Sequence, residues 1–118
     1  MFKVMLTLKK KDGMSREDFI NHYETVHAPL ACKLFGFRSP YRRNYIVYDD
    51  PFLDTVGRPN GDFDVITEND YATREEAQAV LDLYNGPQGQ PIRDDEVNLF
   101  APGGVTFYLV EGYESPLV

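Results

Sequence analysis

A strand, a turn and a helix follow one another in residues 2–37, which read FKVMLTLKKKDGMSREDFINHYETVHAPLACKLFGF. Apolar side chains recur with a period of two from Phe2 to Leu8, which is typical of a β-strand. The intervening residues are partly apolar as well, so we expect both faces of this strand to be covered. Ser15 then begins a helix, with Asp18 at the third helical position in a variant of the capping box.

Strand and helix patterns continue along the rest of the chain. We expect strands over residues 41–48, 63–68 and 105–113, a turn at 102–104, a helix that begins at Thr73, and a short extra helix within residues 91–100. The order β-α-β-β-α-β predicts an α+β, ferredoxin-like domain. Such a domain has a four-stranded antiparallel sheet with helices on one face. The whole chain, residues 1–118, is expected to form one domain of this kind.

The face of the sheet that lacks helices needs cover of another kind. Because its side chains are largely apolar, exposing that face to water would be unfavourable. A second copy of the chain is the simplest cover. The sequence therefore predicts a homodimer that forms through the sheet face.

The composition argues against several classes of protein. The chain carries 19 Asp and Glu residues against 12 Lys and Arg residues, with a net charge of −7, which argues against nucleic-acid binding. No apolar run approaches the roughly 20 residues that a membrane span needs, and no signal-peptide pattern is visible, so we expect no association with a membrane. Cys32 is the only cysteine, which excludes an internal disulfide. These features predict a reduced, cytoplasmic protein.

Both histidines of the chain, His22 and His27, lie on the first predicted helix. On a helix with 100° per residue, His27 falls inside the apolar stripe that faces the sheet, and His22 falls at its edge. Their separation of five residues does not suit a shared metal ion, so we expect no metal site. Two interpretations of His27 remain: a buried histidine satisfied by a carbonyl or a tyrosine, or a general acid or base beside a pocket. Pro29 is expected to kink or break the helix near Ala28.

Several segments resemble the EthD-domain family, one branch of the dimeric α+β-barrel superfamily. The resemblance rests first on residues 5–37, where Gly13-Met14-Ser15 begins the helix and Tyr23 precedes His27-Ala28-Pro29-Leu30. YRRNYIV at residues 41–47, FDVITE at 63–68 and VTFYLVEGYE at 105–114 are similar to the later strands of the family. Tyr45 is a departure, because family members often carry a histidine near this position. The resemblance therefore does not carry a two-histidine mechanism to this chain.

The resemblance implies a ferredoxin-like protomer that dimerises through its sheet, with a small-molecule pocket between helices and sheet. Relatives in the family include polyketide-modifying dehydratases and proteins of aromatic or ether degradation. Related barrels include cofactor-free monooxygenases and lactone isomerases. Because one fold supports many reactions, the resemblance alone does not fix the reaction.

The candidate catalytic residues lie on the first helix and the second strand. His27 is the first candidate, as the proton-transfer group. Tyr41 and Tyr45 share one face of their strand, with Arg43 between them. We expect Tyr45 to hydrogen-bond a substrate oxygen or to orient His27, and the alternative is an aromatic core with hydroxyl groups at its rim.

Further side chains are candidates for substrate binding. They are His22, Tyr23, Arg43, Asp64 and Glu68. The two carboxylates share one face of the third strand. A carboxylate that points into a pocket would act as a base or steer the imidazole, and the alternative is a pair of surface carboxylates.

The aromatic content and the motifs bear on function. Eight Phe and eight Tyr residues, with no Trp, suit a cavity for an aromatic or polycyclic ligand. No redox-cofactor, phosphate-loop or Ser-His-Asp motif is visible, so no cofactor is expected. We therefore expect a cofactor-independent lyase, dehydratase or isomerase that transfers protons on an aromatic, polyketide-like or lactone substrate. The alternatives are a non-catalytic ligand-binding or accessory protein of a degradation or biosynthetic pathway, and a cofactor-free monooxygenase.

Overall fold

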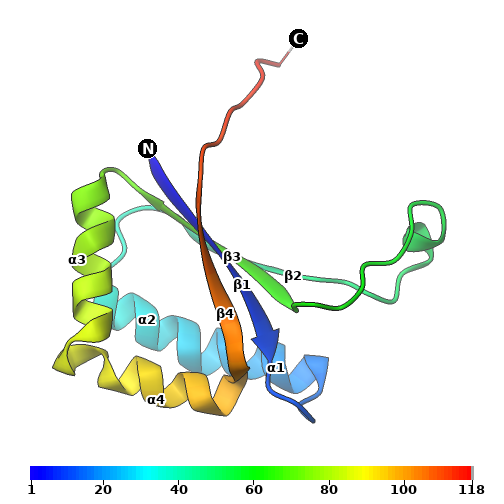
Figure 1. The fold of residues 1–118 in the computed structure, drawn as a ribbon, viewed down its shortest axis with the longest axis horizontal. Helices are drawn as coiled ribbons and strands as arrows, with labels where there is room; N and C mark the ends of the chain where they lie inside the picture. Colours follow the sequence, from blue (N-terminus) through cyan, green and yellow to red (C-terminus); the bar gives the residue numbers. More distant parts are fainter. Residues whose placement is uncertain (118) are drawn as a thin grey trace.

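The structure is a computed structural model that describes residues 1–117 (Figure 1). Its elements are β1 (Phe2–Lys10), α1 (Arg16–His22), the π-helical turn η1 (Tyr23–His27), α2 (Ala28–Phe35), β2 (Tyr41–Tyr45), the 3-10 helix η2 (Pro51–Asp54), β3 (Val65–Tyr71), α3 (Arg74–Asn85), the 3-10 turn η3 (Pro87–Gly89), α4 (Gln90–Leu99) and β4 (Phe100–Val110). The strands form one antiparallel sheet in the order β2-β3-β1-β4. This arrangement confirms the predicted α+β, ferredoxin-like fold.

The register of the sheet determines which side chains face the helices. Leu8 of β1 lies opposite Val65 of β3 and Val105 of β4, and Leu8 and Val65 are buried. Because side chains alternate between the two faces of a sheet, the residues in step with Leu8 form the helix-covered face. The remaining set forms what we call the open face: Lys3, Met5, Thr7, Arg42, Asn44, Ile66, Glu68, Asp70, Thr106 and Tyr108.

An aromatic cluster joins the first helical segment to the sheet. The rings of Phe19, Tyr23 and Phe100 meet edge to face, with centroids 5.7 to 6.0 Å apart. All three side chains are buried. Edge-to-face pairs add to the free energy gained from burial. The cluster therefore holds η1, the segment that carries His27, at a defined position over the sheet.

Of the kink or break expected near Ala28, a break does not occur, because the helix continues through Pro29. It widens instead into one π-helical turn, in which the backbone N–H of Ala28 donates to the carbonyl of Tyr23, five residues earlier. A proline ring clashes with the carbonyl four residues before it in an α-helix, and a π-turn is one way to relieve such crowding. The chain then continues as α2, with Pro29 in its first turn.

Both ends of the first helical segment follow the sequence signals. The hydroxyl of Ser15 accepts a hydrogen bond from the backbone N–H of Asp18 at 3.1 Å, as expected for an N-cap. Gly36 follows α2 with φ of 59°, in the left-handed region that favours glycine.

Five strand boundaries differ from the prediction, including the start of β3 at Val65 and the end of β4 at Val110. β4 begins at Phe100 and includes residues 102–104, which were expected to form a turn. The strand lies at the edge of the sheet, where a proline is tolerated because its missing N–H faces no partner strand, and the pairing with β1 shifts register between Leu8 and Lys10. β2 ends at Tyr45 and β3 extends to Tyr71.

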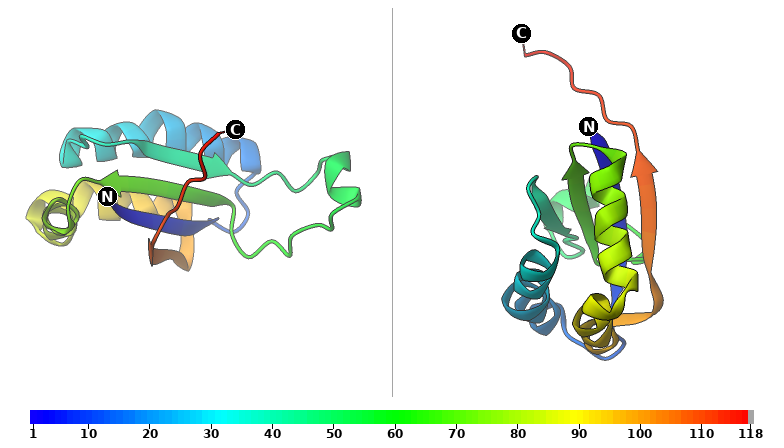
Figure 2. Two further views of the ribbon diagram at one scale, coloured as in Figure 1. Left: turned by 90° about the horizontal axis from the view of Figure 1, so that it is seen from above. Right: turned by 90° about the vertical axis from the view of Figure 1, so that its left-hand side faces the viewer.

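Residues 46–64 connect β2 to β3 and extend away from the sheet and helices (Figure 2). The short helix η2 lies within this connection, and Phe52 and Val56 are exposed there. None of the helices formed by residues 1–117 combines the length and the apolar character that a bilayer span requires.

Candidate active site between the sheet and the helices

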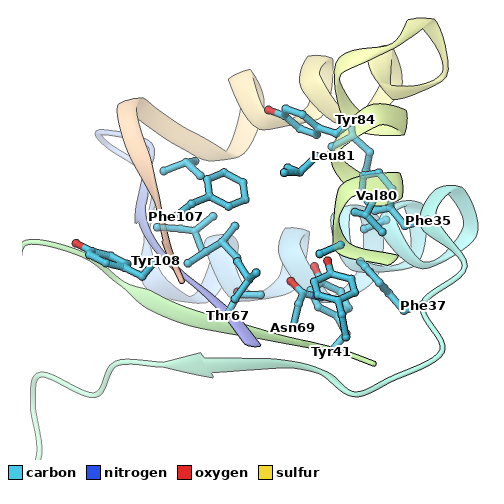
Figure 3. Close-up of a pocket in the computed structure, with 18 of the residues that line it drawn as sticks. Phe35, Phe37, Tyr41, Thr67, Asn69, Val80, Leu81, Tyr84, Phe107 and Tyr108 are labelled. Atoms are coloured by element: carbon cyan, nitrogen blue, oxygen red, sulfur yellow. The ribbon is translucent and has the colours of Figure 1, made fainter. Parts of the chain in front are cut away.

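A cavity of about 460 Å³ lies between the helix-covered face of the sheet and the helices (Figure 3). Its walls are mainly aromatic and aliphatic, with contributions from all four strands. They include Phe2, Val4, Leu6, Tyr23, Phe35, Phe37, Tyr41, Tyr71, Val80, Leu81, Tyr84, Phe100, Phe107 and Leu109. A cavity of this size and character is suited to a small apolar ligand.

His27 lines this cavity and is held by a carboxylate from another helix. Its side chain comes from η1, and the residue is 6% exposed. Nδ1 lies 2.9 Å from Oδ2 of Asp95, on α4. An ionised carboxylate only accepts hydrogen bonds, so Nδ1 carries the proton and donates it. The neutral ring then presents a lone pair at Nε2.

His22 contacts the other oxygen of the same carboxylate. Its Nε2 lies 2.8 Å from Oδ1 of Asp95, and the side chain does not line the cavity. Burial alone would raise the pKa of Asp95, but hydrogen bonds from His22 and His27 hold that pKa below its ordinary value. His22, predicted as a substrate contact, therefore reaches the cavity only through Asp95 and His27.

Two tyrosines of the cavity wall, Tyr23 and Tyr41, carry hydroxyl groups. The ring of Tyr23 stands edge-on to the imidazole, with centroids 5.3 Å apart, and its hydroxyl lies 2.9 Å from Oγ1 of Thr67. Tyr41 lines the same cavity from β2. Burial raises the pKa of both Tyr23 and Tyr41 above the ordinary value for a phenol. Both are therefore neutral donors over the physiological pH range.

The structure places Tyr45 and Arg43 outside the cavity, in contrast to the expected contacts with substrate. The hydroxyl of Tyr45 donates to Oε2 of Glu24. Arg43 binds both oxygens of Glu24, at 2.7 and 2.9 Å, and this hydrogen bonding lowers the pKa of Glu24. The reason is the position of Tyr23, whose ring packs between Tyr45 and the imidazole of His27. Tyr45 therefore does not orient His27.

Asp64 and Glu68 also lie away from the cavity, again in contrast to their expected role. Glu68 lies on the open face, and Asp64, which immediately precedes β3, has the same parity along the chain. Oδ2 of Asp64 accepts a hydrogen bond from the backbone N–H of Lys10 at 2.8 Å. Glu68 accepts one from Asn44 at 3.2 Å and lies 3.8 Å from Arg42. The register that points Val65 at the helices turns both carboxylates away from them.

Four polar residues near the site were not identified from the sequence. They are Thr67, Asn69, Asp95 and Glu96. A signal for the two on α4 was present, because Ile92, Asp95, Glu96 and Leu99 follow the i, i+3, i+4, i+7 spacing of a core-facing stripe. Two carboxylates within such a stripe are unusual, since acidic side chains are seldom buried without a partner.

Glu96 lines the cavity, and burial raises its pKa, although a hydrogen bond with Tyr84 acts in the opposite direction. A raised pKa in the folded state means that ionisation of Glu96 costs stability. That cost is absent below the unfolded-state value of about 4.3 and develops as the pH rises through the folded-state pKa. We therefore expect Glu96→Gln to be more stable than the native chain at pH 7. The difference should vanish near pH 4 in urea unfolding, and a constant difference would contradict this explanation.

The polar groups of the cavity carry no metal-binding arrangement. Within residues 1–117, no cluster of three or more His, Cys, Asp or Glu side chains could hold a metal ion. Asp95 is engaged by two imidazoles instead. The His27–Asp95 pair and the phenols of the cavity wall can transfer protons and form hydrogen bonds.

The EthD domain family matches residues 11–103, which include η1, the cavity-lining strands β2 and β3, and α4. The chain belongs to the EthD family. This confirms the resemblance seen in the sequence. No curated protein matches the EthD chain described here.

Solved structures agree with the family assignment. An ethyl tert-butyl ether D (EthD) family protein from Bacillus halodurans is 23% identical with a TM-score of 0.64, over 96% of this chain and 100% of that chain. A NIPSNAP domain protein from Burkholderia xenovorans is 18% identical with a TM-score of 0.59, over 98% and 99%. A protein from Arabidopsis thaliana is 14% identical with a TM-score of 0.61, over 99% and 100%. At these identities the likeness establishes the fold of the EthD domain.

Proposed function

We propose that this EthD-family domain is a cofactor-independent enzyme that transfers protons on a small aromatic, polyketide-like or lactone substrate, with His27 as general acid and base. One observation carries the proposal. A histidine that is 6% exposed lines an apolar cavity and is bound at Nδ1 by a buried carboxylate, Asp95. A buried histidine that served packing alone would not need a cavity on one side and a carboxylate on the other.

The proposed reaction begins when the lone pair of Nε2 takes a proton from a carbon next to a carbonyl group of the substrate. The electrons of the C–H bond move to the carbonyl oxygen and form an enolate. Asp95 stabilises the resulting imidazolium, and a neutral phenol of the cavity wall donates a hydrogen bond to the developing negative charge. The proton then returns at a different carbon, which is an isomerisation, or protonates a departing hydroxyl group as water, which is a dehydration.

A reaction-independent assay tests the proposal. The probe is α-tetralone with a hydroxyl group on its aromatic ring, which we call hydroxytetralone. In D₂O, the native protein is expected to accelerate the exchange of the protons next to the carbonyl group for deuterium. The exchange is measured as the loss of the ¹H NMR signal of these protons. The acceleration should saturate with probe concentration and exceed that of the same concentration of free imidazole. Saturable binding with no acceleration would contradict the proposal and favour a ligand-binding protein.

We also propose that the EthD domain forms a homodimer through its open face. Support comes from the apolar side chains that this face presents at its centre, Met5 and Ile66, and from Tyr108, which is 49% exposed. Charged groups lie on this face as well, with Glu68 directly opposite Met5 and next to Arg42. A face that combines apolar and charged side chains is suited to self-association.

The homodimer is expected to scatter light as a particle of twice the 13.5 kDa chain mass. Ile66→Glu would bury a carboxylate at the centre of the interface without a partner, so this variant should become monomeric at micromolar concentration. Val47→Glu, which makes the same change in the exposed connection between β2 and β3, is the control and should remain a dimer. A monomeric native protein would refute the proposed homodimer.

A further inference from the structure

Asn69, on β3, has a buried polar atom in the cavity wall that lacks a partner. Its Nδ2 makes no hydrogen bond within residues 1–117, and the residue is 7% exposed. The side chain lies on the helix-covered face, opposite Val4 of β1 and Tyr41 of β2. Figure 3 shows it beside Tyr41 and Thr67, in the wall of the cavity.

The packing of Asn69 gives no reason for an amide at this position. A buried donor without an acceptor destabilises the folded protein, whereas a leucine has nearly the same shape and no such cost. Oδ1 of Asp70 also lacks a hydrogen-bond partner, but it faces the cation of Lys3 at 3.7 Å on the open face. The group that Nδ2 lacks is an acceptor, and Asn69 lines the ligand cavity.

We propose that Asn69 is a specificity residue, whose Nδ2 donates a hydrogen bond to an acceptor oxygen of the ligand. The oxygen belongs to a phenol, phenolate or carbonyl group on a fused-ring molecule. This inference rests on the proposed function for the ligand class. Rotation of the terminal amide by half a turn exchanges the positions of Nδ2 and Oδ1, which occupy nearly the same volume. Either position can therefore present the N–H donor to the ligand without a change in packing.

The geometry places this oxygen away from the reacting carbon. The ring centroid of Tyr23 lies 5.3 Å from that of His27, and the hydroxyl group of the same ring lies 2.9 Å from Oγ1 of Thr67. Asn69 follows Thr67 on the same face, roughly 7 Å further along the strand. A ligand that reaches both His27 and Asn69 is therefore longer than one ring. The selected oxygen is on the ring remote from His27.

A matched pair of probes tests this assignment by affinity alone. Hydroxytetralone and α-tetralone differ only in the hydroxyl group on the aromatic ring. The native protein is expected to bind hydroxytetralone about tenfold more tightly, as one additional hydrogen bond predicts. Asn69→Leu should bring the ratio of the two affinities to about one. Asn98→Leu makes the same change on the exposed side of α4 and should keep the native ratio.

A retained ratio in Asn69→Leu, or equal affinities in the native protein, would overturn the assignment. Side-chain amide NMR of the native protein gives an independent answer if the variant does not fold. The Asn69 amide protons should shift with hydroxytetralone and stay in place with α-tetralone, and the reverse result would also overturn it. Because these are equilibrium measurements, they are separate from the proton-exchange assay. If the native protein prefers hydroxytetralone but does not accelerate proton exchange, His27 is not a general base, and the assignment of Asn69 stands.

Discussion

His27→Gln is expected to lower the rate of proton exchange on hydroxytetralone by about 100- to 10,000-fold, the range typical of a lost general base. Glutamine has an amide that remains neutral at every working pH. It therefore cannot hold the proton between its removal from the substrate and its return. Its length allows the amide nitrogen to keep a hydrogen bond to Asp95, which limits the structural damage. The measurement is the exchange rate by NMR at saturating probe.

Two controls separate chemistry from structure in this variant. Lys33→Gln makes a change to glutamine on the exposed side of α2 and should retain the native rate. The affinity of His27→Gln for hydroxytetralone should stay within a few fold of native, because the probe is held mainly by apolar contacts. An exchange rate equal to the native rate, with binding intact, would exclude His27 as the base.

The relation between the two histidines shows where the sequence failed to predict the site. With 100° per residue, His22 and His27 are expected on different parts of the helix. The π-turn from Tyr23 to His27 uses one more residue per hydrogen-bonded ring than an α-helix does. Residues five apart are therefore brought toward one side, and both imidazoles reach Asp95. Pro29 indicated that the helix departs from α-helical geometry near this point, but it did not indicate that the departure is a π-turn.

Strand parity predicted which residues share a face, but not which face meets the helices. Asp64 and Glu68 both lie away from the cavity, and Tyr41 lines it. The choice between faces depends on the pairing of β3 with β1, where Leu8 lies opposite Val65. Since β1 and β3 carry apolar residues on both faces, the pattern along either strand does not distinguish the two. The face that meets the helices is therefore known only once the strands are paired in the folded sheet.

The element order was accessible from the sequence because it depends on local signals. Alternating apolar residues, the Ser15 cap and the glycine at the end of α2 all act within one element. The role of Asp95 depends on its contact with His27, which is 68 residues away in the sequence. The helix that carries Asp95, α4, was expected only as a short extra helix. Long-range partners of this kind carry no local signal beyond a charged residue in an apolar stripe.

In the proposed mechanism Asp95 orients His27, so no histidine is needed at position 45. The family often has a histidine near Tyr45, and in this chain that hydroxyl is bound to Glu24. The second imidazole comes instead from His22, on the same helical segment as His27. The pair does not act on the ligand from two sides, because His22 does not line the cavity. Its hydrogen bond fixes Asp95, and Asp95 fixes His27.

Asp95→Asn is expected to reduce the exchange rate by at least about 100-fold, because it disturbs the tautomer of His27. The carboxylate accepts from both imidazoles, at 2.8 and 2.9 Å. An asparagine has one accepting oxygen and one donating nitrogen, so one of the two rings must present a lone pair to the amide. Where that ring is His27, its proton moves to Nε2, the atom that should receive the proton of the substrate. Asp94→Asn, the same change on the exposed side of α4, should retain the native rate.

The tautomer and the pH dependence of stability distinguish positioning from a general structural role for Asp95. Imidazole ¹⁵N shifts should show the proton of neutral His27 on Nδ1 in the native protein and mainly on Nε2 in Asp95→Asn. The hydrogen bonds that lower the pKa of Asp95 stabilise the fold above its unfolded-state value of about 3.9, and this contribution is lost as the pH falls through the folded-state pKa. The variant should therefore be less stable than native at pH 7 and approach it in acid. Unchanged ¹⁵N shifts with a lower exchange rate would contradict the positioning role, since the tautomer is the link between Asp95 and the base.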